Sequence, residues 1–139
     1  MGLVYADVEL YNAYDIEQAR RNIIDMDDIR RMPINILVDT GSVMLAINES
    51  IQEQLDLPIV EKRRMQLAIG HIQEFDVLSQ VELRFKNRRT ICNAIVLPGD
   101  SEPLLGAIPL EDMDVLIHLL RQELIVNPDH PYVVQLKLK

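Results

Sequence analysis

Tryptophan is absent from this chain, and aromatic residues make up only 4% of it. Since 48% of the residues are hydrophobic, we expect a sizeable core filled by Ile, Leu, Val and Met. Cysteine occurs once, as Cys92, which excludes an intramolecular disulfide and is compatible with a reducing cytoplasm. No motif beside Cys92 supplies a base, so we interpret it as a small buried apolar residue and not as a nucleophile.

Positive charge is also scarce. Lys and Arg total 14 against 22 Asp and Glu, for a formal net charge of −8 and a pI near 4.8. This balance argues against broad binding to nucleic acid or to an anionic membrane surface. Two basic runs, 62–64 and 86–89, are interpreted as solvated loops or protected sheet edges. No apolar run reaches about 18 residues and no export signal is visible, so we expect neither export nor membrane spanning, and a cytoplasmic location.

Metal-binding and serine-hydrolase patterns are missing as well. The histidines His71, His118 and His130 are scattered, and neither HExxH nor a cysteine pattern accompanies them. Ser42 lacks the GxSxG context of a hydrolase nucleophile. We therefore expect no metal and no cofactor.

What the sequence does contain is a series of β-type segments, which predict a single mostly-β domain over residues 1–139. Strands are predicted over 3–11, 34–38, 43–47, 65–69, 72–78, 80–85, 90–97 and 132–139. A helix is predicted over 16–31 with Asp15 as its N-cap, and a shorter one over 49–55 with Asn48 as its N-cap. Residues 114–128 fit either a helix that continues from Pro109 or two strands that turn near Arg121.

A polar interruption between two of these apolar runs stands out. Asp39 follows the run 34–38 and is succeeded by Thr40, Gly41 and Ser42. Such residues can serve turn geometry alone. An acid at the end of a buried strand is nevertheless costly unless something satisfies or uses it, and Thr40 and Gly41 can supply hydroxyl and backbone N–H donors. The residues by themselves leave both interpretations open.

The string LVDTGS, followed by MLAI, resembles the active-site loop of the pepsin-like and retropepsin-like aspartic proteases. A second signature of that group, two apolar residues and a glycine after a β-rich stretch, is matched by Leu104, Leu105 and Gly106. The hairpin candidate around Ile69, Gly70 and His71 lies between the two, where the family's substrate-covering flap belongs. The chain most resembles the small single-domain bacterial aspartyl proteases of the retropepsin-like clan.

The resemblance implies an all-β, closed-barrel-like retropepsin fold with a few short helices, in which residues 16–31 form a helical insertion. It also favours strands over 114–127, with a turn at Arg121-Gln122. Because Asp-Thr-Gly occurs once, the resemblance further implies a homodimer that brings two copies of Asp39 together. The terminal segments 3–11 and 132–138 would suit an intersubunit sheet, although ordinary pairing within one chain is an equal alternative.

The implied activity is that of an aspartic endopeptidase that cleaves an extended peptide or protein substrate. One Asp39 would take a proton from the attacking water while the other hydrogen-bonds the peptide carbonyl. Thr40 would brace the loop across the dimer, Gly41 would donate its N–H, Ser42 would hydrogen-bond Asp39, and the flap would close over the substrate.

Two departures favour an alternative. Ala107 stands where many retropepsins have a polar anchor after the second glycine, and the flap candidate has a single glycine. The alternative is a catalytically silent protein of the same fold that binds peptides or acts as a scaffold, with Asp39 as a structural turn acid.

Overall fold

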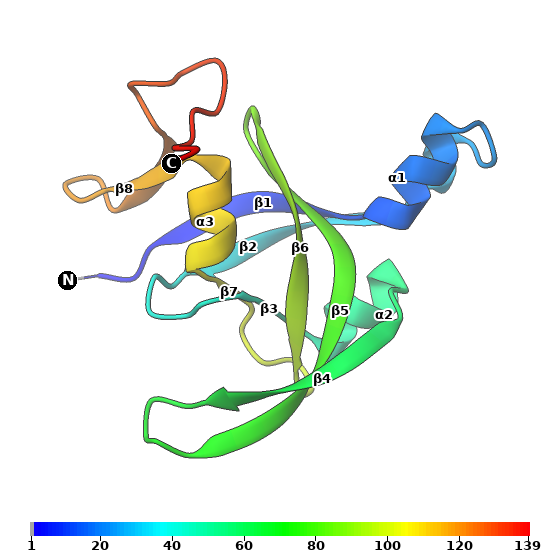
Figure 1. Cartoon of the computed structure of the whole chain (residues 1–139), viewed down its shortest axis with the longest axis horizontal. Coiled ribbons are helices and arrows are strands. Elements are labelled where there is room, and N and C mark those ends of the chain that lie inside the picture. The colour runs from blue at the N-terminus through cyan, green and yellow to red at the C-terminus, as the bar shows by residue number, and fades with distance from the viewer. Residues whose placement is uncertain (1) are drawn as a thin grey trace.

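The computed structural model describes residues 2–139 and consists mainly of strands (Figure 1). The strands are β1 (Tyr5–Asn12), β2 (Arg31–Val38), β3 (Leu45–Asn48), β4 (Ile59–Gln66), β5 (Ile72–Phe85), β6 (Arg88–Leu97), β7 (Leu104–Leu105), β8 (Val115–His118) and β9 (Glu123–Val126). The helices are α1 (Ala13–Arg20), α2 (Glu49–Leu55), α3 (Ala107–Met113) and the short 3-10 helix η1 (Met26–Asp28). The predicted all-β class with a few short helices is confirmed.

Seven strands form one sheet in the order β1-β2-β7-β3-β6-β5-β4. The end of β1 also pairs with β5, from Glu9 opposite Arg84 to Asn12 opposite Val81, so the sheet bends round into a ring. Strands β8 and β9 form a separate hairpin. In Figure 1 this hairpin and the loop that follows β2 lie at one end of the molecule, and α1 lies at the other.

Aliphatic side chains fill the ring, as expected from the lack of aromatics. Along β1, Ala6, Val8 and Leu10 are buried, because alternate residues of a strand point to the same face. Complete burial of such an aliphatic side chain contributes about 1.5–3 kcal/mol. A second, smaller cluster lies beneath the β4–β5 hairpin and consists of Met44, Ala46, Phe75, Val77 and Ile95.

The predicted helix over 16–31 is wrong in its bounds. Asn12 is the N-cap instead of Asp15: its side chain accepts from the amide of Asp15, so α1 begins at Ala13. The helix ends at Arg20, and Asn22 has a positive φ of 61°, which a continuing helix does not allow. The Asp15 carboxylate instead accepts from the backbone and guanidinium of Arg30, which lowers the pKa of this carboxyl. The insertion is therefore a short helix, a loop and η1.

The two strands predicted over 72–78 and 80–85 form one strand, β5. Opposite β6, Leu78 pairs with Ala94 and Val81 with Cys92, so β5 carries one extra residue between these pairs. This is a β-bulge, and Gln80 within it has a φ of +63°. Because the bulge interrupts the alternation along β5, the sequence pattern predicts two strands where the structure has one.

In the ambiguous segment 114–128, Asp114 is the C-cap of α3 and the strands β8 and β9 follow it. The strand interpretation is confirmed, and Gln122 adopts a positive φ of 49° in the connecting turn. The short helix over 49–55 is also confirmed, with the side chain of Asn48 accepting from the amide of Ile51 at 2.9 Å.

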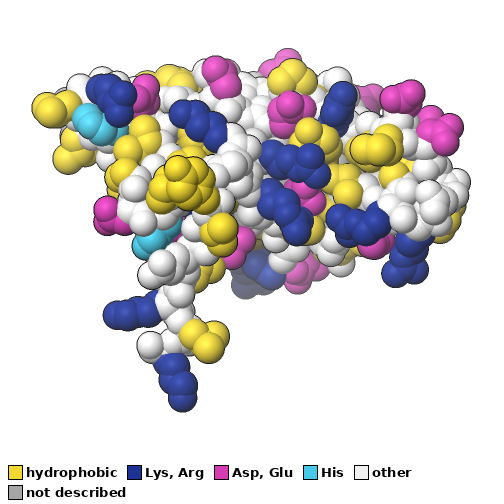
Figure 2. Space-filling model, turned by 90° about the horizontal axis from the view of Figure 1, so that it is seen from above, with side chains coloured by type: hydrophobic (Ala, Val, Ile, Leu, Met, Phe, Trp, Pro, Cys, Tyr) yellow, Lys and Arg dark blue, Asp and Glu magenta, His cyan; other side chains and the backbone are white. Residues whose placement is uncertain are grey.

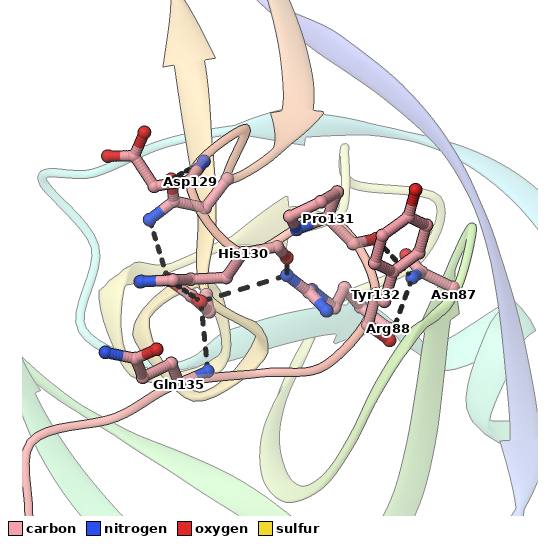
Figure 3. A network of polar contacts seen from close by, with 9 residues as sticks. Asn87, Arg88, Asp129, His130, Pro131, Tyr132 and Gln135 are labelled. Atoms are coloured by element: carbon pink, nitrogen blue, oxygen red, sulfur yellow. Dashed lines mark hydrogen bonds and ion pairs between the residues drawn. The ribbon is translucent and has the colours of Figure 1, made fainter.

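The predicted strand over 132–139 is wrong for the single chain, in which these residues pair with no strand of the described part and a polar network holds the segment instead (Figure 3). The Asp114 carboxylate accepts from the side-chain amide of Asn127 (3.0 Å) and the backbone N–H of Gln135 (3.2 Å), and contacts the His130 ring at 2.7 Å. The buried Arg88 donates to the carbonyl of His130. We call these contacts the C-terminal clamp.

Among residues 2–139, no helix is long and apolar enough to cross a membrane.

Candidate active site

The two sequence signatures lie side by side in the fold. Strand β2 runs parallel to β7, with Leu37 opposite Leu104 and Val38 opposite Leu105. The backbone N–H of Asp39 then donates to the carbonyl of Leu105 at 2.9 Å. The end of β2 therefore delivers Asp39 against β7, although the two segments are far apart in the sequence.

The carboxylate of Asp39 is held by its own loop. Oδ1 accepts from the backbone N–H of Gly41 at 3.0 Å, and Oδ2 accepts from the hydroxyl of Ser42 at 2.9 Å. The backbone N–H of Ser42 closes the turn by donating to the Asp39 carbonyl at 3.1 Å. Because Asp39 is only half-buried, the oriented carboxylate can still be reached from outside the chain. Such an oriented, accessible acid can exchange a proton with a bound molecule.

Gly106 allows the close approach that locks this loop. A Cβ at this position would lie 2.8 Å from the Ser42 carbonyl oxygen and closer still to that of Met44. The neighbouring amides of Ala107 and Ile108 donate to the carbonyls of Ser42 and Val43 at 2.8 and 2.9 Å. The apolar-apolar-glycine signature thus fixes the Asp39 loop to the start of α3 through backbone contacts.

Thr40 is exposed and lies between two hollows of the surface. One, of about 280 Å³, is lined by residues that include Leu3, Thr40 and Leu119; the other, of about 330 Å³, includes Thr40, Leu110 and Leu116. Ile117 lines both. Thr40 is thus the polar side chain shared by two largely apolar depressions, one on each side of it.

The β4–β5 hairpin ends in the predicted turn. Leu67 and Gly70 close it, with the amide of Leu67 donating to His71 at 2.7 Å and the amide of Gly70 donating to Leu67 at 2.8 Å. Gly70 has a φ of +84°, a conformation that favours glycine. Ile69 at the tip is 87% exposed. Behind the tip, Met65 and Leu67 pack on the cluster that contains Met44, so the hairpin's inner face lies towards the Asp39 loop.

The histidines and Cys92 were the other residues considered for metal binding or nucleophilic chemistry. Within the part of the chain that the structure describes, no group of three or more His, Cys, Asp and Glu side chains could hold a metal ion. Burial raises the pKa of the Cys92 thiol to about 12, which keeps it protonated at neutral pH and fits an inert core residue.

One functional candidate was missed at the sequence level. Arg63, in a run assigned to a loop or edge, has its guanidinium Nη1 3.7 Å from the sulfur of Met44. The signal that could have found it is alternation, because Arg63 and Met65 are two residues apart in β4 and share a face of the strand.

Comparison with known families bears on this arrangement. A family model described as "Aspartyl protease" matches residues 25–108, which is more than half of the chain and includes Asp39 and Gly106. A search of curated proteins gave no match. The match supports a protease-like function broadly.

Proposed function

The chain belongs to the aspartyl protease family, and we propose that it is an aspartic endopeptidase, active as a homodimer with Asp39 from each subunit at a shared site. The observation that carries the proposal is the Asp39 carboxylate, held on one oxygen by Gly41 and on the other by Ser42. The Asp-Thr-Gly string occurs once in the chain, so a second carboxyl of the same kind has to come from a second copy.

The proposed chemistry uses the two carboxyl groups as a pair that holds one proton. The ionised member takes a proton from a water molecule, and the water oxygen bonds to the peptide carbonyl carbon at the same time. The protonated member hydrogen-bonds the carbonyl oxygen, which becomes a hydroxyl of the tetrahedral intermediate. When the C–N bond breaks, the carboxyl that took the water's proton passes a proton to the amine nitrogen, and the other carboxylate takes a proton from a hydroxyl of the intermediate. The products are a new carboxyl end and a new amino end, and the pair again holds one proton.

The surface around Asp39 supports a self-association role. Val43 and Ile108 are linked through their backbones beside the loop, and their side chains are 55% and 53% exposed. On the other side, Leu119 and Leu120 at the tip of the β8–β9 hairpin are 74% and 93% exposed. These exposed apolar side chains lie around Thr40, so they could form the centre of a subunit interface that includes the Asp39 loop.

The C-terminal segment supports the same assembly. Within one chain, β1 pairs with β2 and β5, so the intrachain alternative holds for residues 5–12. Residues 132–138 pair with no strand of the part described here and expose Tyr132, Val133, Leu136 and Leu138. Figure 2 shows the C-terminal end as a stalk that projects from the body. We propose that this segment pairs with the second copy.

The proposed substrate is an extended peptide that lies between the Asp39 loop and the inner face of the β4–β5 hairpin. Leu67 and Leu104 are partly buried beside the second cluster, and their side chains provide an apolar surface for the peptide. Exposed Ile69 and the glycine turn at the tip are suited to close over the backbone and exclude water.

The test combines assembly with cleavage. Sedimentation equilibrium at acidic and neutral pH should show a dimer, and the dimer should cut a peptide library. Asp39→Asn should abolish cleavage and leave the dimer intact, whereas Asp27→Asn, on an exposed acid of η1, should cut normally. Cleavage that survives Asp39→Asn removes Asp39 from the mechanism. A dimer that binds peptides without cutting them would support the catalytically silent alternative.

A further inference from the structure

The basic run Lys62-Arg63-Arg64 divides between the two faces of β4. Lys62 and Arg64 stand opposite Asp76 and Glu74 of β5, and Lys62 forms an ion pair with Asp76 at 3.3 Å. Arg63 stands opposite Phe75, which is buried in the second cluster. Residues opposite each other in an antiparallel pair share a face, so Arg63 points to the inner side of the hairpin.

This inner position places a guanidinium next to the Asp39 loop. Nη1 of Arg63 lies 3.7 Å from the sulfur of Met44. Met44 is two residues from Ser42, whose hydroxyl donates to Asp39 at 2.9 Å. A peptide lying between the hairpin and the loop would therefore pass close to the Arg63 side chain.

The guanidinium is only weakly engaged. Its Nη2 donates to Glu61 at 3.0 Å, but the side chains of Arg63 and Glu61 are 44% and 46% exposed, and ion pairs of that kind contribute little. The Met44 thioether is a weak acceptor. Several N–H donors of Arg63 are thus available to a ligand, in a fork whose geometry matches a carboxylate.

We propose that Arg63 is a specificity-determining residue that favours substrates with an Asp or Glu side chain near the bond to be cut. The inference rests on the proposed function and adds a substrate class to it. An uncharged side chain of the same shape, such as Gln, offers no charge-assisted pair and would be the poorer substrate.

Peptide pairs that differ only by Glu or Gln test this, with the exchange made at each position around a cleaved bond. At one or more positions, the wild-type protein should show kcat/KM about tenfold higher for Glu, the effect of one charge-assisted hydrogen bond. The preference should shrink as salt is raised, since the Arg63 side chain is partly exposed and its charge is screened. Arg63→Gln should abolish it, whereas Arg64→Gln, on the opposite face of the same strand, should retain it. Glu61→Gln should increase it by freeing the guanidinium.

A binding measurement separates this proposal from the cleavage it rests on. The same Glu and Gln peptides, made uncleavable by a reduced bond, are titrated against the dimer of each variant. If the wild-type protein binds the Glu peptide more tightly than the Gln peptide and Arg63→Gln does not, the proposed specificity is supported. This holds even if no peptide is cut, and then only the proposed endopeptidase activity fails. An equal Glu-to-Gln ratio in wild type and Arg63→Gln overturns the proposal. If Arg63→Gln only increases self-association, the residue protects the β4 edge and the proposal is likewise overturned.

Discussion

The backbone N–H of Asp39 donates to the carbonyl of Leu105 at 2.9 Å, which joins the end of β2 to β7 at the point where the Asp39 loop begins. This bond involves only main-chain atoms, so its strength does not depend on either side chain. Because the loop is tied to the sheet here and to α3 at Ser42 and Val43, the carboxylate has a rigid base.

Gly106→Ala should damage the site through sterics. The added Cβ meets the carbonyl oxygens of Ser42 and Met44, which are backbone atoms, so the loop or α3 must shift. We expect a loss of about 1–3 kcal/mol in the free energy of unfolding, measured by urea denaturation, and loss of cleavage.

Gly70→Ala provides the contrast to that substitution. A Cβ on Gly70 meets nothing within 4 Å, but the residue has a φ of +84°. The cost should be about 1 kcal/mol of backbone strain at the hairpin tip, with the Asp39 loop unchanged. If Gly106→Ala and Gly70→Ala lose equal stability and equal activity, the close packing at Gly106 does not hold the Asp39 loop in place.

Ser42→Ala removes the donor to Oδ2 of Asp39 but leaves the Gly41 contact in place. A carboxylate that is held on one side only should be oriented less well, and we expect kcat to fall about tenfold or more, with little change in melting temperature. Ser50→Ala, which removes an exposed hydroxyl that donates to Asp100, is the control. Unchanged kcat in Ser42→Ala would contradict the role of this hydroxyl.

Leu119→Asp combined with Leu120→Asp should weaken self-association. Both side chains are largely exposed in the single chain, so the change should leave the fold intact, while a charge buried in an interface is costly. Sedimentation equilibrium should show the dissociation constant raised about 10-fold to 100-fold, with cleavage falling in parallel. Ile23→Asp, also exposed but beside α1 at the far end, should dimerise normally. If the wild type, the double variant and Ile23→Asp have equal dimer dissociation constants, the tip of the β8–β9 hairpin is excluded from the interface.

The C-terminal clamp should open in acid. The hydrogen bond from Asn127, followed by the Gln135 amide and His130, lowers the pKa of Asp114 below its ordinary value of 3.8. A carboxyl with a lowered pKa stabilises the fold above the unfolded-state pKa, and this contribution is lost as the pH falls through the folded-state value. The protection of the Gln135 amide against exchange, expressed relative to the intrinsic exchange rate at each pH, should therefore fall as the pH falls below about 4. Asp114→Asn should show low protection at every pH, and equal pH dependence of the protection in both proteins would contradict the clamp.

Local chemistry allowed several features to be predicted from the sequence. The Asn48 cap and the glycine turn at Gly70 were among them, because each depends only on neighbouring residues. The bounds of α1 could not be predicted, because Asn12 and Asp15 compete as caps and the contact of Asp15 with Arg30 decides between them. The bulge in β5 could not be predicted from the sequence either, because the extra residue is defined only by the pairing of β5 with β6.

The sequence by itself determined the two signatures, Asp39-Thr40-Gly41-Ser42 and Leu104-Leu105-Gly106, and the single copy of the first. It also determined the aliphatic composition of the core, because those properties are carried by residue identity and spacing. Only the tertiary structure decided that the two signatures touch, that Arg63 faces inwards, and that residues 132–138 pair with no strand in the described part of their own chain. These outcomes depend on strand register and on contacts between residues distant in the chain, which local patterns do not specify.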